Sequence, residues 1–429
     1  MDNNETTDKG FQHQLTLEHN AYYAELKAQI LRLLEQGEYD QALTFLSCSG
    51  NRDNEAKHNF SSSVESISQS SHSFVEYIIY LLLAELAFTH SDDAYGLETL
   101  ARALLLGRQQ NYVDLDCLNH DAMRDLCIRA LRNNIEIAYV QQLIKTQKLN
   151  PKPPPFDVKH WPWELKIYTL GRFSILLNGK PLSVSGKGPA KPVEFVKVLV
   201  ALGGREVSES DLCEVLWPDS DGDQAHSAFT TTLSRCRKLI GKQLLQLNNA
   251  QLSLNDHLCW VDSWSFERTL GELESMLGQH ETQLKQSVQL KVDGLFELYH
   301  GLFMEKEPAT GWVLPQRERL RTKFMRIIKL LIQFYRDRGG SCKKVILLYE
   351  KARELDPLSE EYCRGLMRCH AAQGNRPEAL AIFDRCHSVL IEAFGIEPSD
   401  ITTQLYQLIK TGDQQQLLGF CDVCSRAEN

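Results

Sequence analysis

The residues whose types and spacing most clearly suit a functional contact lie in one predicted helix, from Asp221 to Gly241. Its apolar residues recur at helical spacing and are expected to face a core. These apolar positions are Ala225, Phe229, Leu233, Cys236 and Ile240. No Asp or Glu occurs from Gln224 to Asn255, although the whole chain has a net charge of −9. The exposed face therefore combines cations with small hydroxyl side chains.

This combination suits duplex DNA, because small polar residues let a helix approach base edges while cations bind phosphates. The candidates for base contacts are Ser227, Thr230, Thr231 and Ser234. The candidates for phosphate contacts are Arg235, Arg237, Lys238 and Lys242. The same pattern also suits a solvated amphipathic helix whose cationic last turn is favoured by the helix dipole. Asp221 or Asp223 is expected to cap the helix, and Gly241 to end it as a left-handed C′ residue.

The other cysteines and histidines that could bind a metal or take part in catalysis do not have the spacing of a metal, redox or catalytic site. Cys421 and Cys424 have the spacing of a metal or redox pair, but no second pair of ligands accompanies them, so a tail without a metal is expected. His257, His300 and His370 lack partner spacing and are expected to be core or surface residues. No nucleophile–base set is present, so the sequence predicts no catalytic residues, no bound cofactor and no enzyme.

Tryptophans at the two ends of residues 161–264 are expected to serve packing rather than stacking on single-stranded nucleic acid. They are Trp161, Trp163, Trp260 and Trp264.

The elements around the basic helix predict a small mixed domain. Alternating apolar residues predict strands at 165–169 and 173–177, followed by the hairpin turn Asn178-Gly179, and Gly171 is a candidate bulge. Lys191-Pro192 opens one helix that Gly203-Gly204 closes, and Ser208 to Asp211 has the form of a capping box for the next. A second hairpin follows the basic helix, with Asn248 and Asn249 at its tip. Strands, three helices and a closing hairpin indicate a winged helix.

A series of motifs resembles two domains of known families. Leu170-Gly171-Arg172-Phe173, Leu216-Trp217-Pro218-Asp219 and residues 233–241 resemble the OmpR-like winged helix, in the version found in the antibiotic-pathway regulators of the SARP family. Trp312-Val313-Leu314, residues 355–361 and Phe394-Gly395-Ile396-Glu397-Pro398 look like the bacterial transcriptional activation domain that follows it there. The resemblance implies that the third helix enters the major groove, that the wing tip touches the next groove, and that the following domain supports activation.

Helical repeats are expected on both sides of the winged helix. Gly374 and Ala379 repeat the spacing of Gly339 and Lys344, and Gly37 precedes Ala42 by a similar interval, which predicts tetratricopeptide-type hairpins. Helices are predicted at 74–88, 94–110, 120–133 and 135–146, and the region resembles the last repeats of large regulators similar to the maltose activator. No phosphate-binding Gly-x-x-x-x-Gly-Lys-Ser/Thr motif accompanies it.

Composition sets the class and the compartment. Hydrophobic content of 43% and charged content of 24% are those of ordinary globular protein. The scattered cysteines favour a reducing environment, the polar start predicts no signal peptide, and the apolar run 77–88 is too short to span a bilayer. A cytoplasmic protein is expected.

The predicted fold is mainly α with a small α+β winged-helix domain and TPR-like helical repeats on both sides. The predicted division is a repeat region at 1–150 with a flexible insertion at 47–73, a Pro-rich linker at 151–160, a winged helix at 161–262, an activation domain at 263–411 and a tail at 412–429. The predicted function is sequence-specific transcriptional regulation. The expected partners are double-stranded DNA, RNA polymerase or another protein bound by the helical repeats, and a second copy of the chain on DNA. The alternative is a repeat-type adaptor whose winged helix makes only protein contacts.

Overall fold

The computed structural model describes residues 72–113, 120–182, 190–278, 285–309, 311–337 and 342–412, with scattered positions between 28 and 45. The described chain is mainly helical with two small sheets, as predicted. It divides into two compact units, one of residues 1–164 with 256–258, and one of the remainder. The polar start lies outside the described residues, as do the predicted insertion at 47–73, except for its last two residues, and the tail that holds Cys421 and Cys424.

The first unit contains the predicted helices, with boundaries shifted by one or two residues. They are α4 (His72–Thr89), α5 (Asp93–Gln110), α6 (His120–Arg132) and α7 (Ile137–Gln147). Asp92 caps α5 by accepting a hydrogen bond from the Tyr95 amide at 3.2 Å. Tyr77 and Tyr139 join α4 to α7 through their hydroxyls at 3.2 Å. None of the helices in the described residues is long and apolar enough to cross a membrane.

The proline-rich segment at 151–160 packs into the first unit, whereas the sequence predicted an extended linker. Phe156 and Val158 are buried, and the Phe156 ring stacks on Trp163 at 5.5 Å. The Gln141 amide donates to the His160 carbonyl at 2.8 Å, which ties the segment to α7. Prolines prevent a helix here, but the apolar residues between them still gain by burial. The boundary between the units therefore falls after Glu164.

The second unit begins with a sheet of order β3-β2-β1-β7. Its strands are β1 (Leu165–Tyr168), β2 (Ser174–Leu177), β3 (Lys180–Pro181) and β7 (Cys259–Val261), and Leu165 pairs with Leu177 in the antiparallel register of β1 and β2. Asn178 and Gly179 have φ of 50° and 77°, so the predicted two-residue hairpin is confirmed. The pairing of β7 parallel to β1 was not expected from the sequence.

Three helices and a second sheet follow. The helices are α8 (Ala190–Ala201), α9 (Glu209–Leu216) and α10 (Gly222–Ile240), and the sheet has order β4-β6-β5. Its strands are β4 (Val207–Ser208), β5 (Leu245–Asn248) and β6 (Gln251–Leu254), with the 3-10 turn η1 (Lys242–Leu244) before β5. Ser208 accepts the Asp211 amide at 3.0 Å and caps α9 as expected. Phe195 of α8 packs against Phe229 of α10, with ring centroids 5.6 Å apart.

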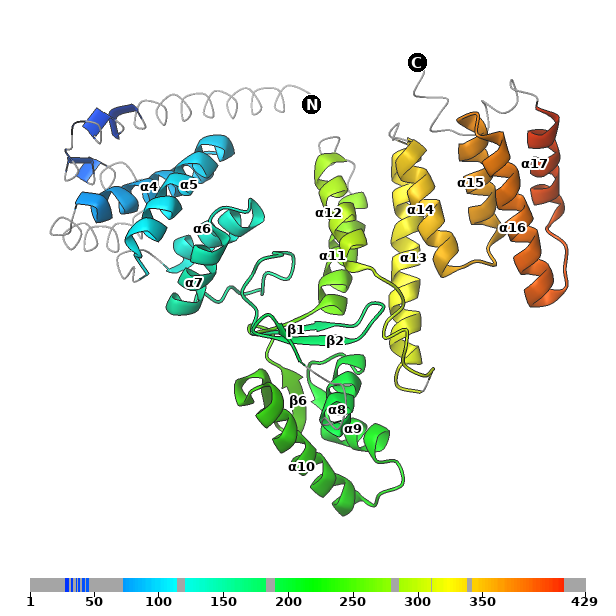
Figure 1. Ribbon diagram of the computed structural model, residues 1–429, viewed down its shortest axis with the longest axis horizontal. Helices are drawn as coiled ribbons and strands as arrows, with labels where there is room; N and C mark the ends of the chain where they lie inside the picture. The colour runs from blue at the N-terminus through cyan, green and yellow to red at the C-terminus, as the bar shows by residue number, and fades with distance from the viewer. Residues whose placement is uncertain are drawn as a thin grey trace, which may run out of the picture. The chain divides into compact units, whose positions relative to one another are not determined.

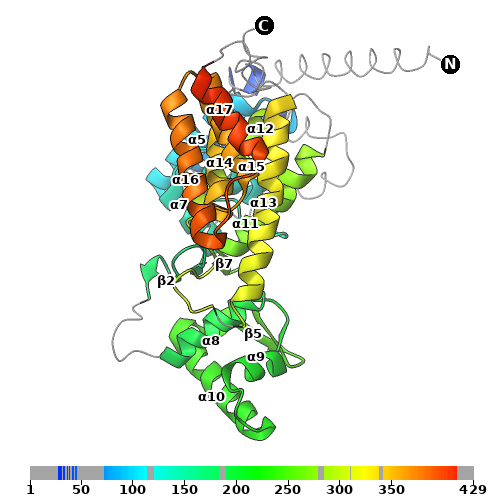
Figure 2. The ribbon, with the colours of Figure 1, turned by 90° about the vertical axis from the view of Figure 1, so that its right-hand side faces the viewer.

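The rest of the second unit is helical (Figures 1 and 2). It comprises α11 (Asp262–Leu277), α12 (Lys285–Leu298), α13 (Leu314–Asp337), α14 (Cys342–Leu355), α15 (Glu360–Ala372), α16 (Arg376–Phe394) and α17 (Asp400–Thr411). Gly374 ends α15 with φ of 78°, and Ala379 is fully buried in α16, as a packed helical hairpin requires. Its predicted counterpart Gly339 lies outside the described residues.

Gly171 joins the two parts of the second unit, where the sequence predicted a bulge. Its amide donates to the Leu302 carbonyl at 2.8 Å, and its carbonyl accepts from the Glu305 amide at 2.9 Å. A Cβ at Gly171, where φ is 90°, would lie 2.9 Å from the His300 carbonyl oxygen. The segment before α13 therefore pairs directly with the loop that follows β1, through an isolated antiparallel bridge between Leu170 and Phe303.

Asp262 reinforces this junction from the start of α11. Its carboxylate accepts the Thr169 amide at 2.7 Å, the Leu170 amide at 2.8 Å and the Thr169 hydroxyl at 2.5 Å. Burial raises the pKa of the Asp262 carboxyl, and these hydrogen bonds oppose the shift.

Candidate nucleic-acid interface

The candidate interface is built on α10, which begins at a strong cap. The Asp221 carboxylate accepts the Gln224 amide at 2.9 Å, so Asp221 rather than Asp223 is the N-cap. All five predicted core positions of the helix are buried. The predicted left-handed C′ residue is wrong in detail, because Gly241 has φ of 120° and ψ of 138°. This extended backbone with positive φ is open to glycine, and it directs the chain into η1 and β5.

The exposed face of α10 carries the predicted hydroxyl residues. Ser227, Thr231, Ser234 and Lys238 are all exposed and follow one another at intervals of four, three and four residues. That spacing places them in one row on the side of the helix away from the core. Thr230 is exposed beside this row, and its hydroxyl donates to the His226 carbonyl at 3.0 Å.

A cavity lies along each side of this row. One, of about 620 Å³, is lined by Ser227, Thr231 and Arg235 together with Lys191 of α8. The other, of about 450 Å³, is lined by Thr230, Ser234, Lys238 and Lys242. The helix is therefore a ridge between two concave flanks, and each flank contains cations. In both views α10 lies at one end of the second unit, away from α15, α16 and α17 (Figures 1 and 2).

Charge changes sign along α10. Asp221 and Asp223 are exposed at its start, and His226 pairs with Glu209. Toward its end, Arg235, Lys238 and Lys242 form no ion pair with any residue that the structure describes. Unpaired cations retain their full attraction for an incoming polyanion, so the last third of α10 and the turn after it are the part that suits phosphate.

Arg237 differs from the other predicted contacts. It is half-buried, and its Nη2 donates to the Leu245 carbonyl at 3.3 Å, which ties the end of α10 to β5. Asn248 and Asn249 lie exposed at the tip of the β5–β6 hairpin, where Asn249 and Ala250 have φ of 49° and 57°. The structure thus brings nine of the ten predicted residues to the exposed surface of this region and leaves Arg237 half-buried at the edge of the second cavity.

The sequence reasoning missed several residues that line the flanks. Lys191 comes from a different helix, where its Nζ donates to the Leu216 carbonyl at 3.1 Å and lies 5.3 Å from the Trp217 ring. Nothing in the local sequence of Lys191 indicates this position. Gln224 and His226 are exposed on α10 itself. Gln224 precedes Thr231 by two helical turns and His226 precedes Thr230 by one, so helical spacing in the sequence could have identified both.

The tryptophans and histidines that the sequence singled out lie outside the α10 surface. Trp161, Trp163, Trp260 and Trp264 are at most 9% exposed, which confirms the packing role expected for them. The Trp264 indole donates to the Gly203 carbonyl at 3.0 Å. His257 and His370 are half-buried, and His300 lies beside Gly171. Within the described ranges, no group of His, Cys, Asp or Glu side chains is placed to hold a metal.

Comparison with known proteins identifies the class of the helical part. Residues 261–410, from the end of β7 to the last turn of α17, match the family model of the bacterial transcriptional activator domain. The predicted resemblance of this part of the chain is therefore confirmed. The chain carries this domain directly after the region that contains α10.

Two individual proteins are similar over longer stretches. The regulatory protein AfsR of Streptomyces griseus is 22% identical over 249 residues, which are 57% of this chain and 25% of that protein. The chain thus spans about a quarter of the length of this relative. A solved structure of Mycobacterium tuberculosis EmbR, in complex with a low-affinity phosphopeptide, has 17% identity and a TM-score of 0.41, covering 60% of this chain and 69% of that chain.

Proposed function

We propose that the chain is a cytoplasmic, sequence-specific transcriptional regulator that activates genes. In this proposal α8, α9, α10 and the β5–β6 hairpin act as an OmpR-like winged helix, with α10 in the major groove of double-stranded DNA. The activator domain at 261–410 and the first unit act as TPR-like repeats, the latter similar to those of the maltose activator, and contact proteins. RNA polymerase is the first candidate partner, and a second copy on repeated half-sites is another.

The observation that carries the proposal is the ridge of α10 between two cationic flanks. B-DNA has a major groove about 12 Å wide, bounded on both sides by phosphates, and it admits one helix. Ser227, Thr231 and Ser234 stand on the crest and would reach base edges. Arg235 lies on one flank and Lys242 on the other, and Lys238 ends the crest row beside Lys242, so these cations would meet the phosphate backbones. Asn248 and Asn249 would contact the backbone or the neighbouring groove.

The test is a titration of the full chain with genomic duplex fragments at several salt concentrations. Binding should weaken steeply with salt, because each neutralised phosphate releases counterions. A reporter assay on a recovered site then measures activation. No duplex binding at low salt would leave the alternative, an adaptor whose α10 surface contacts only proteins.

A pair of variants tests whether α10 is the element that binds DNA. Lys238→Ala should weaken DNA binding, while Lys343→Ala, at an exposed position on α14, should leave it unchanged. Equal effects of the two changes would argue against α10 as the DNA-binding element.

A further inference from the structure

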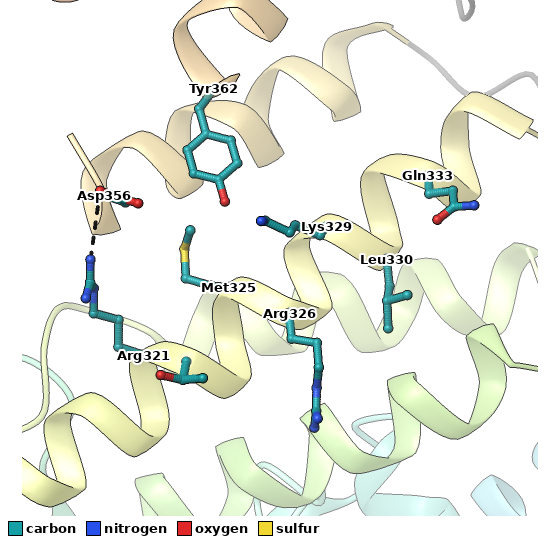
Figure 3. Close-up of a pocket in the computed structure, with 9 residues that line it drawn as sticks. Arg321, Met325, Arg326, Lys329, Leu330, Gln333, Asp356 and Tyr362 are labelled. Atoms are coloured by element: carbon teal, nitrogen blue, oxygen red, sulfur yellow. Dashed lines mark ion pairs between the residues drawn. The ribbon is translucent and has the colours of Figure 1, made fainter. Parts of the chain in front are cut away.

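A cavity of about 460 Å³ opens on the activator domain, remote in sequence from α10. Most of its lining comes from one face of α13, and Tyr362 of α15 and Asp356 complete it (Figure 3). The α13 residues are Arg321, Thr322, Met325, Arg326, Lys329, Leu330 and Gln333. Three of them are cations, whereas Asp356 is the one carboxylate of the lining.

The cations and the apolar surface alternate along α13. Arg321, Met325 and Lys329 succeed one another at intervals of four residues, so they form one row along the helix. At 1.5 Å per residue, the backbone positions of Arg321 and Lys329 are about 12 Å apart along the axis, with Met325 midway between them. In Figure 3 the Met325 side chain points toward Tyr362, whereas Arg326 points away from it, toward its ion-pair partner Glu274 on α11.

Neighbouring groups fix the two ends of this row. The Arg321 Nε donates to the Leu355 carbonyl at 3.0 Å, so the guanidinium is held at the end of α14. Tyr362 is 3% exposed and forms the back of the cavity, with the Lys329 Nζ 5.9 Å from its ring centroid. Burial raises the pKa of the Tyr362 phenol above its usual value, so the hydroxyl stays neutral and can donate a hydrogen bond.

The cations at the cavity form ion pairs that are partly or largely exposed. Lys329 and Glu361 are 3.9 Å apart, with side chains 56% and 65% exposed. Arg321 lies 3.3 Å from Glu318 and 4.0 Å from Asp356, and Arg326 pairs with Glu274 at 2.9 Å. Exposed pairs of this kind contribute little free energy, so an incoming carboxylate can replace them at small cost. The site therefore presents two available cations on either side of a half-buried apolar surface.

We infer that this cavity binds a short acidic segment of a protein partner, with one apolar side chain between two carboxylates. An extended chain places residues i, i+2 and i+4 on one side and spans about 13 Å between the first and the last. That span matches the axial separation of the Arg321 and Lys329 backbone positions, and the central apolar side chain then lies on Met325 against Tyr362. The inference rests on the proposed role of the activator domain in contacting proteins, and it names the chemistry of the segment that the domain takes.

The test uses the full chain and a labelled synthetic peptide in which two aspartates flank a leucine, each separated from it by one glycine. Fluorescence anisotropy should show saturable binding that Lys329→Glu weakens at least about tenfold. The matched control Lys343→Glu makes the same charge change on an exposed residue outside the cavity and should leave the affinity unchanged. A peptide with one aspartate replaced by lysine should bind the Lys329→Glu variant better than it binds the unaltered chain.

Several results would overturn the inference. An isomeric peptide with adjacent aspartates binding equally well would show that spacing is not recognised, and displacement of the acidic peptide by millimolar inorganic phosphate would indicate a general anion site. Thermal melting and DNA affinity are measured on the same samples. If the unaltered chain binds DNA but not the peptide, the inference about this cavity is wrong and the proposed function stands. If the unaltered chain does not bind DNA, the proposed function is contradicted, and the peptide titration still tests the cavity.

Discussion

Helices α10 and α13 are both amphipathic and both rich in cations, but their cations are used differently. On α13, Arg319 and Lys323 both pair with Glu267 of α11, and Arg326 pairs with Glu274. On α10 and the turn after it, Arg235, Lys238 and Lys242 form no ion pair within the described chain. A count of basic residues does not distinguish these helices. The pairing of each cation does, because only an unpaired cation keeps its attraction for a distant polyanion.

The largest expected effect comes from removing the unpaired cations of α10. The triple variant Arg235→Ala/Lys238→Ala/Lys242→Ala should lower duplex affinity at least about a hundredfold near physiological salt. The slope of log affinity against log salt should become shallower by about three, since each phosphate contact contributes about 0.9. The double variant Arg319→Ala/Lys323→Ala on α13 serves as the control, and a comparable loss of DNA binding in it would erase the distinction between the helices.

The hydroxyl residues of the row on α10 and the lysine at its end should also differ in their effect on DNA binding. Thr231→Ala is expected to cost about 1 kcal/mol of discrimination between a preferred site and unrelated DNA, with little change in salt dependence. Lys238→Ala should weaken all sequences about equally. Parallel titrations of both variants on specific and non-specific duplexes measure this, and a reversal of the two patterns would mean that a different face of α10 enters the groove.

On α13 the expected effect falls on stability. Glu267→Gln removes the carboxylate shared by Arg319 and Lys323 and should lower the free energy of unfolding by roughly 0.5–1 kcal/mol, because these cations are partly exposed. Denaturant melts report the loss, and DNA affinity should not change. A clear gain in DNA affinity would indicate that the two released cations reach the duplex.

The smallest expected effect concerns the acidic start of α10. Asp223→Asn removes an exposed negative charge from the same flank as Arg235 and should strengthen duplex binding about twofold to threefold at low salt. The gain should vanish above about 0.5 M salt, where exposed charges are screened. Unchanged affinity at low salt would place the start of α10 away from the phosphates.

The elements that depend on local rules were predictable from the sequence. The boundaries of α10, the Ser208 cap, and the turn at Asn178-Gly179 follow from residues within a few positions of each other. The exposed hydroxyl row and the buried face of α10 follow from periodicity alone.

Features that depend on partners distant in sequence were not predictable. Arg237 is half-buried because the Leu245 carbonyl is within reach, and Lys191 arrives at the interface from another helix. Residues 151–160 are packed because α7 offers a surface to them. The junction at Gly171 has the same cause, since Leu302 and Glu305 lie more than a hundred residues away.

That junction fixes the side of the DNA duplex toward which the activator domain of the proposed regulator faces. The backbone hydrogen bonds of Gly171 and the buried Asp262 carboxylate join the region of α10 directly to the activator domain. The domain then faces one side of the duplex, and moving the bound site rotates that direction. A shift by about five base pairs turns it to the opposite side and should silence a promoter, whereas a shift by about ten should restore it. The helical phase of the site, beyond its sequence, thereby becomes part of the signal.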